Sequence, residues 1–195
     1  MVTIKVIVGS TRPNRFGIQP AEWLTSYAKK TYSDKVKFEL VDLADINLPF
    51  LDEPQVPTVS IEKEHSLQWS KIIAEADGFV FVAPEYNHSY SPVLKNAIDF
   101  LSSEWAHKPV AFLSYGAAAG GARSVEHLRD VVAWLKMYDL AEQILLPNYF
   151  ADLDENGNYK FTERHEKNAH EMLEALIFWA RIFKEARAKL ITKQI

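Results

Sequence analysis

The sequence predicts an α/β protein built around a doubly wound parallel sheet, and three observations lead to this fold class. Strand-like runs alternate along the chain with segments of helical periodicity, as in proteins made of βαβ units. Two of the runs, residues 78–83 and 109–114, are apolar almost throughout, which is typical of strands covered on both faces. The 195 residues suit one domain, expected to span residues 1–195, because no repeat, low-complexity tract or linker divides them.

The N-terminal part of the chain is expected to begin with a strand. Residues 2–8 are rich in β-branched side chains, and residues 18–30 then carry apolar side chains at helical spacing. A second strand is expected at residues 35–41, where apolar and polar residues alternate. Residues 45–58 contain three prolines and are expected to form a loop, and residues 62–76 form the next predicted helix.

The rest of the chain repeats the alternation of strand and helix. The expected elements are a strand at residues 78–83, a helix at 92–101, a strand at 109–114, a helix at 122–137, a strand at 143–146 and an amphipathic helix at 163–189. Ser91 and Pro92 favour a helix start, because serine is a good N-cap and proline suits the first helical position. Ligands of such sheets bind beyond the carboxyl ends of the strands, so the loops that follow the strands are the candidate site.

Charge and composition exclude several classes of function. The net charge of −4 disfavours broad attraction to nucleic acid or to an anionic membrane, so neither is an expected partner. The absence of cysteine excludes disulfides, thiolate catalysis and cysteine-ligated metal sites. No signal peptide and no apolar stretch of membrane-spanning length is visible, so a cytoplasmic protein is expected.

The loop over residues 9–17, which follows the first strand, has features of a phosphate-binding loop. The next helix is expected to start near residues 17–18, and a helix N-terminus presents unpaired N–H groups and partial positive charge to an anion. Ser10 adds a hydroxyl, and Arg12 and Arg15 add guanidinium groups that suit phosphate oxygens. Neither a Walker A motif nor Gly-x-Gly-x-x-Gly is present, which favours a phosphate held without a metal; a solvated basic turn is the alternative.

Two further loops follow the two most apolar strands. In residues 84–92, Tyr86 offers a flat face and Asn87 offers a donor and an acceptor, which suits the edge of a heterocyclic ring. Glu85 and His88 have side chains that can transfer protons, although the segment also fits a proline-bounded turn. Residues 114–121 consist mostly of alanine and glycine, so their backbone can approach a ligand; a loose connection to the next helix is the alternative.

Taken together, the loops resemble those of the NAD(P)H-dependent FMN reductase family. The resemblance rests on Gly9-Ser-Thr-Arg12, Pro84-Glu-Tyr-Asn87, Leu94-Lys-Asn-Ala-Ile-Asp-Phe100 and Ser114-Tyr-Gly116, and it spans about residues 2–146. It implies a flavodoxin-like fold, a three-layer α/β/α sandwich whose five-stranded parallel sheet has the order 2-1-3-4-5. It also implies FMN as cofactor, NAD(P)H as co-substrate, a small-molecule electron acceptor such as free flavin or a quinone, and a homodimer or homotetramer.

The same resemblance assigns the site residues. The phosphate of FMN would be bound by Ser10, Arg12, Asn14, Arg15, Gly17 and Ile18, the isoalloxazine ring by Pro84, Glu85, Tyr86 and Asn87, and the border of the ring by Ser114, Tyr115 and Gly116. No side chain is expected to be catalytic, because the flavin carries the redox chemistry. A flavodoxin-like electron carrier without pyridine-nucleotide activity is the main alternative, and a flavin-free phosphate-binding regulator is another; Arg12 and Arg15 favour the enzyme over the carrier.

A possible calcium loop lies near the C-terminal helix. Residues 152–163 match the EF-hand pattern, but Pro147 stands where the incoming helix would be and Lys160 occupies a position usually given to a ligand. An Asx-rich turn explains the same residues equally well, and no metal is expected. His165 and His170 lie five residues apart, about 140° around a helix, and therefore cannot share one zinc ion.

Overall fold

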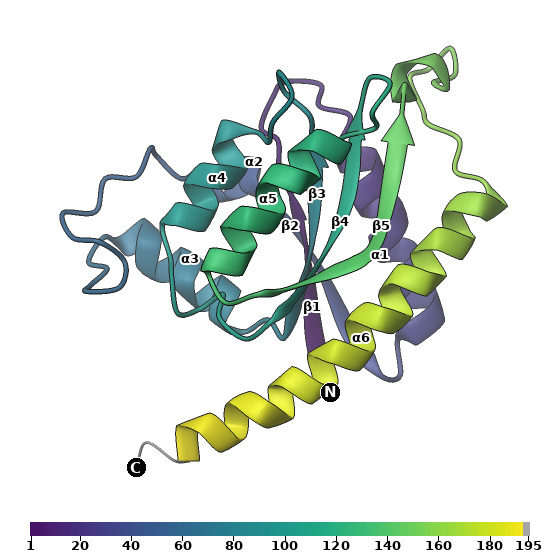
Figure 1. Cartoon of the computed structure of the whole chain (residues 1–195). Coiled ribbons are helices and arrows are strands. Elements are labelled where there is room, and N and C mark those ends of the chain that lie inside the picture. Colours follow the sequence, from purple (N-terminus) through teal and green to yellow (C-terminus); the bar gives the residue numbers. More distant parts are fainter. Residues whose placement is uncertain (193–195) are drawn as a thin grey trace.

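Five parallel strands form one sheet in the order β2-β1-β3-β4-β5 (Figure 1), which is the order that the resemblance implies. The computed structural model describes residues 1–192. The strands are β1 (Val2–Val8), β2 (Val36–Asp42), β3 (Gly78–Pro84), β4 (Pro109–Gly116) and β5 (Tyr138–Pro147). Every residue of β3 and β4 is buried, as expected for central strands with both faces covered.

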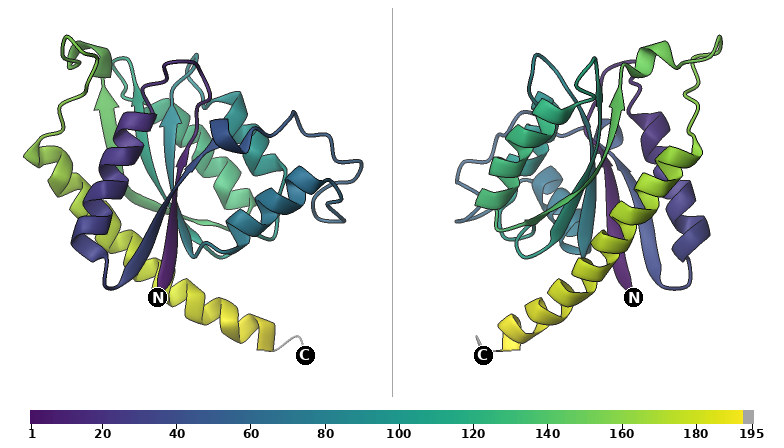
Figure 2. Two further views of the ribbon diagram at one scale, coloured as in Figure 1. Left: turned by 180° about the vertical axis from the view of Figure 1, so that it is seen from behind. Right: turned by 45° about the vertical axis from the view of Figure 1, so that its right-hand side comes forward.

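Helices cover both faces of the sheet and complete three layers (Figure 2). The helices are α1 (Ile18–Tyr32), α2 (Leu43–Ile46), α3 (Glu64–Ala74), α4 (Pro92–Asp99), α5 (Ala122–Trp134) and α6 (Glu163–Thr192), with a 3-10 turn η1 (Tyr149–Ala151) after β5. Apolar side chains of α1 and α6 form one core with the sheet, and those of α3, α4 and α5 form a second core on the opposite face. The predicted doubly wound fold is thereby confirmed.

Two local features differ from the expectation. The β5 strand is longer than residues 143–146, because as an edge strand it alternates buried and exposed positions and its full length carries no continuous apolar run. The first two residues of the expected loop at residues 45–58 belong instead to the one-turn helix α2, whose N-terminus is capped where the Asp42 carboxylate accepts the N–H of Ala44 at 2.9 Å. A single helical turn is too short to produce a recognisable periodicity.

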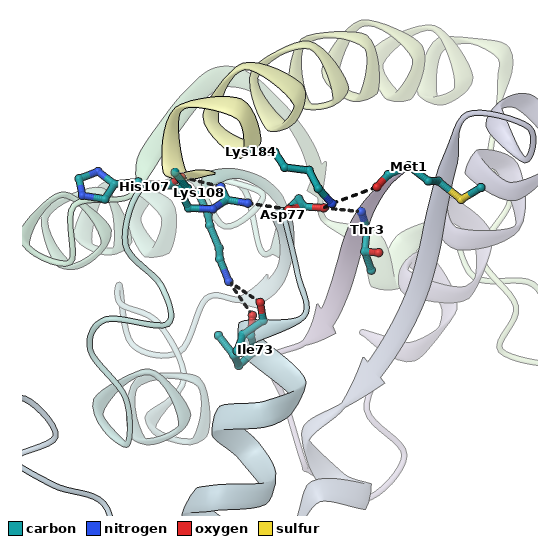
Figure 3. Close-up of polar contacts among 9 residues, drawn as sticks. Met1, Thr3, Ile73, Asp77, His107, Lys108 and Lys184 are labelled. Atoms are coloured by element: carbon teal, nitrogen blue, oxygen red, sulfur yellow. Dashed lines mark hydrogen bonds and ion pairs between the residues drawn. The ribbon is translucent and has the colours of Figure 1, made fainter. Parts of the chain in front are cut away.

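The long α6 helix crosses the face of the sheet that α1 also covers and reaches the edge where β1 begins (Figure 1). The buried Asp77 carboxylate anchors it there (Figure 3), because it binds Lys184 Nζ at 2.7 Å and Arg187 Nη2 at 2.6 Å, and it also accepts the Thr3 N–H at 3.0 Å. Close by, the buried Lys108 ammonium donates to the last carbonyls of α3, with Ile73 O at 2.8 Å. Among residues 1–192, no helix combines the length and the apolar character that crossing a bilayer requires.

Candidate functional site

Three loops meet where the neighbouring strands β1, β3 and β4 end, at the edge of the sheet opposite the Asp77 anchor (Figure 1). Hydrogen bonds tie these loops to one another. The Gly9 N–H donates to Val82 O at 2.9 Å, the Ser91 hydroxyl donates to Gly9 O, and the Glu85 N–H donates to Tyr115 O at 3.0 Å. The parallel sheet therefore converts three separate stretches of sequence into one connected rim.

A small pocket of about 80 Å³ opens within this rim. Its lining combines four predicted residues of the first loop with a proline and four aromatic side chains: Ser10, Arg12, Pro13, Asn14, Arg15, Phe16, Tyr86, Tyr115 and Tyr149. Larger hollows lie elsewhere on the described part of the chain, including one of about 880 Å³ along β2, away from the three loop ends. The pocket accepts a group of phosphate size, whereas a three-ring heterocycle must lie outside it.

Gly17, the N-cap residue of α1, directly follows Phe16, one of the residues that line the pocket. No side chain caps the helix at this position, and a Cβ built on Gly17 would lie 2.6 Å from Tyr115 Oη. Tyr115 is 5% exposed, and burial raises the pKa of its phenol well above the usual value. The phenol therefore stays protonated beside the start of α1, and only glycine leaves it room.

The two arginines of the first loop lie in different environments. Arg15 forms an ion pair with Asp42, the buried carboxylate at the end of β2. The Arg12 side chain is exposed, its guanidinium carbon lies 5.7 Å from the centre of the Tyr86 ring, and no carboxylate of residues 1–192 lies within ion-pair distance of it. Arg12 is therefore available to an anion, whereas Arg15 holds the first loop against β2.

The second loop forms a tight hairpin turn. Tyr86 and Ser89 exchange backbone hydrogen bonds of 2.8 and 3.0 Å, and Asn87 and His88 between them both have positive φ, at 49° and 67°. Two consecutive positive φ values are typical of a type I′ turn. The turn directs Tyr86 back to the first loop, where its hydroxyl lies 2.7 Å from Ser10 Oγ.

Glu85 is held by the helix that follows the third loop. One carboxylate oxygen accepts Arg123 Nε at 2.7 Å and the other accepts the Arg123 backbone N–H at 3.2 Å, so Glu85 caps the N-terminus of α5. Its neighbour Pro84 is the last residue of β3. In the predicted ring-binding segment, Asn87 is therefore the residue that is exposed, while the Glu85 carboxylate bonds to α5 and the N–H groups of Glu85 and Tyr86 are already hydrogen-bonded.

The third loop is more tightly folded than the loose connection that the sequence left as the alternative. The Ser114 hydroxyl is fully buried and donates to Gly120 O at 3.0 Å, so it points into its own loop. Gly121 has a φ of +90°, and a Cβ there would lie 2.6 Å from the Ser114 Cβ. Gly116 lies directly against the Glu85 side chain, since its built Cβ would come within 3.2 Å of Glu85 Cβ.

Several residues that shape the rim were not predicted. They are Phe16 and Tyr149, which line the pocket, and Asp42 and Arg123, which pair with Arg15 and Glu85. Phe16 carried a signal, because an apolar side chain inside a polar loop needs a place to be buried. Ile18, which was predicted, is the first residue of α1 and lies directly after Gly17.

The two histidines at the start of α6 are engaged separately. His165 Nδ1 lies 3.0 Å from both the Thr162 N and the Thr162 Oγ1, whereas His170 Nδ1 lies 2.9 Å from the Tyr32 hydroxyl. Residues 1–192 contain no cluster of three or more His, Asp or Glu side chains that could hold a metal ion.

Comparison with known proteins gives consistent results. The model of the NADPH-dependent FMN reductase family matches residues 2–151. The NAD(P)H-dependent FMN reductase ntnL of Nectria sp is 38% identical over 152 residues, which cover 75% of this chain and 76% of that protein. The 2-hydroxy-1,4-benzoquinone reductase of Burkholderia sp is 32% identical over 186 residues, covering 91% and 96%.

Among solved structures, the flavoenzyme NAD(P)H:(acceptor) oxidoreductase FerB of Paracoccus denitrificans superimposes with a TM-score of 0.73. The two chains are 21% identical, and the match covers 94% of this chain and 99% of that one. At this identity the superposition demonstrates a shared fold.

Proposed function

This chain belongs to the NADPH-dependent FMN reductase family, and we propose that the rim formed by its three loops is where it binds FMN. It is an FMN- and NAD(P)H-dependent oxidoreductase. When bound there, FMN would supply the redox chemistry that couples the oxidation of NAD(P)H to the reduction of an acceptor. Family membership supports the enzyme over the electron carrier that the sequence left as an alternative.

The observation that carries the proposal is the pocket lined by residues of the first loop, directly before the start of α1. In the first turn, Gln19 and Ala21 donate to carbonyl oxygens and Pro20 has no N–H, so we assign the N–H of Ile18 to the phosphate. Arg12 contributes a guanidinium that no carboxylate of the described residues neutralises. A helix N-terminus beside an available cation is the donor set that a phosphate monoester needs.

The ring of the flavin would lie outside the pocket, over the hairpin turn and the third loop. Within Pro84 to Asn87, Asn87 offers an exposed amide side chain there, and Ala117 and Ala118 offer only small exposed side chains. The aromatic residues Tyr86 and Tyr115 are assigned to the phosphate side, because both line the pocket. The protein's task is then to orient two ring systems and to exclude water from them.

The electron acceptor and the assembly are also part of the proposal. A quinone or a free flavin is the proposed acceptor, supported by the Burkholderia relative named as a benzoquinone reductase. A homodimer or homotetramer is supported by exposed apolar side chains in the segment before α3, among them Phe50 at 84% and Val59 at 70% exposure. Residues 1–195 would act as one domain in the cytoplasm, where NAD(P)H is available.

The experiment that tests the function uses the purified full chain. We expect flavin absorbance bands after reconstitution with FMN, saturable FMN binding, and NADPH oxidation that depends on added quinone or flavin. Protein that binds FMN without oxidising NADPH or NADH would support the electron carrier. Folded protein that neither binds FMN nor changes its fluorescence on titration would exclude both.

A further inference from the structure

The segment between β5 and α6 contacts the first turn of α1. Residues 149–159, here called the brace, begin with the η1 turn and lie over the rim beside β5 (Figures 1 and 2). The family model ends at residue 151, so most of the brace lies outside the match. It includes residues 152–159 of the acidic motif, for which the sequence offered an Asx-rich turn as the alternative to a calcium loop.

One amide side chain joins the brace to α1, acting both as hydrogen-bond donor and as acceptor. Gln19, in the first turn of α1, donates from Nε2 to Gly157 O at 2.7 Å and accepts the Tyr159 N–H on Oε1 at 2.8 Å. A pair of hydrogen bonds from one amide fixes both the distance and the orientation of the two segments. Phe16 O accepts the backbone N–H of Gln19 at 3.0 Å, so the constraint continues into the phosphate loop.

The brace is itself held in shape by the acidic motif. The Asp154 carboxylate accepts the N–H groups of Asn156 and Asn158, both at 2.8 Å, and Gly157 adopts a φ of +78°. These hydrogen bonds lower the pKa of the Asp154 carboxyl below its usual value. The arrangement is the Asx-type turn that the sequence offered as the alternative to a calcium loop.

Aromatic contacts reinforce the same connection. The Phe16 ring stacks on Tyr149 with centroids 4.0 Å apart, and it meets Tyr159 edge-on at 5.4 Å and Tyr115 edge-on at 5.2 Å. Phe16 is 8% exposed although it lies in a loop whose other side chains are mostly exposed. Two brace residues therefore bury the one apolar side chain of the phosphate loop.

We propose that the brace positions the N-terminus of α1 for the phosphate of FMN and that Gln19 is its principal positioning residue. This inference rests on the proposed function. The Gly17 N-cap has no side-chain cap and residues 11–14 are exposed, so the part of the loop between the Ser10 hydrogen bond and the Arg15–Asp42 ion pair has few restraints of its own. An external clamp reduces the conformational entropy that the loop loses when it binds an anion.

The test compares FMN with riboflavin, which has the same ring but no phosphate. In Gln19→Ala we expect the Kd for FMN to rise about tenfold, the equivalent of one to two hydrogen bonds, while the Kd for riboflavin stays within about twofold. Amide hydrogen exchange at position 19 and at Ala21 should accelerate in the flavin-free variant, a readout that does not depend on flavin binding. Asp154→Ala changes an exposed position, so it should produce the same selective loss of FMN affinity while the protein stays folded.

Asn96→Ala is the matched control. Asn96 makes an equivalent two-way amide clamp, donating to Pro49 O at 2.7 Å and accepting the Leu51 N–H at 2.9 Å, but it lies on α4. Its removal should leave the ratio of riboflavin to FMN affinity unchanged. The inference would be overturned if Gln19→Ala lost the same affinity for both flavins, or if its FMN affinity and amide hydrogen exchange were unchanged. A wild-type protein that binds no FMN would instead overturn the proposed function.

Discussion

Replacing Arg12 with alanine tests the assignment of the phosphate pocket most directly, because the two arginines of the first loop have separable roles. Arg12 is exposed and contacts the face of Tyr86, whereas Arg15 is paired with buried Asp42. Loss of Arg12 should weaken phosphate binding and leave the fold intact. Loss of Arg15 should instead leave the Asp42 carboxylate buried without its partner, which lowers the free energy of unfolding.

The magnitude for Arg12 follows from its contacts. A hydrogen bond to a charged group contributes about 1.5–3 kcal/mol. An exposed cation–π contact such as that with Tyr86 contributes about 0.5–1 kcal/mol, and phosphate binding would exchange part of this contact for the new one. We therefore expect Arg12→Ala to weaken FMN binding by about 1–2 kcal/mol, or roughly five- to thirtyfold in Kd.

Fluorescence titration with FMN and riboflavin, together with urea denaturation, measures both properties. Arg12→Ala should raise the Kd for FMN alone and weaken its dependence on salt, with the free energy of unfolding within about 0.5 kcal/mol of wild type. Arg15→Ala is the contrasting variant and should lose about 2–4 kcal/mol of stability, slightly below the range for a fully buried pair. An Arg12→Ala protein that binds FMN as tightly as wild type, or loses riboflavin affinity equally, would refute the assignment.

Three further predictions concern the framework of the site. Burial lowers the pKa of the Lys108 ammonium from near 10.5 to about 8, so the folded state loses this proton at a lower pH than the unfolded state does. The free energy of unfolding of the wild-type protein should therefore rise between pH 8 and 10 by about 2–3 kcal/mol. Urea melts of Lys108→Met should lack that rise, and an equal rise in this variant would contradict the buried charge. Asp77→Ala should lower stability by about 2–4 kcal/mol and speed amide exchange around Lys184, whereas unchanged exchange there would argue against the anchor. Gly17→Ala should destabilise the protein by about 1–3 kcal/mol and weaken FMN binding, and adding Tyr115→Phe should restore part of the stability. Thermal melts of the single and double variants measure this. If the stability changes of the two single variants simply add up in the double variant, the two residues do not clash.

Much of the fold could be predicted because its signals are local. The fully buried strands β3 and β4 coincide with the apolar runs of the sequence, and Ser91 caps α4 through the N–H of Leu94, as its position before Pro92 indicates. The sheet order came from the resemblance, since no local pattern specifies which strands are neighbours. The three loop ends then had to converge, because strands β1, β3 and β4 are adjacent in that order.

The partners of the charged side chains could not be predicted in the same way. Arg15 and Asp42 lie 27 residues apart, and Glu85 and Arg123 lie 38 residues apart, so neither pair leaves a recognisable spacing. The resemblance assigned Tyr115 to the border of the ring, whereas only the structure reveals that its side chain lines the small pocket and that its hydroxyl lies beside Gly17. The direction of a side chain at the end of a strand depends on tertiary packing, which a motif does not encode.

The distribution of charges at the rim fits an enzyme whose cofactor carries the chemistry. Both Glu85 oxygens accept hydrogen bonds from Arg123, and burial keeps the Tyr115 phenol protonated, so these two groups are held in fixed structural roles. A hydride transfer between two rings needs no acid or base from the protein, only their alignment and the exclusion of water. The polar side chains at the rim can therefore shape loops, and Arg12, with no acidic partner among the described residues, is the one whose guanidinium stays available to bind a phosphate.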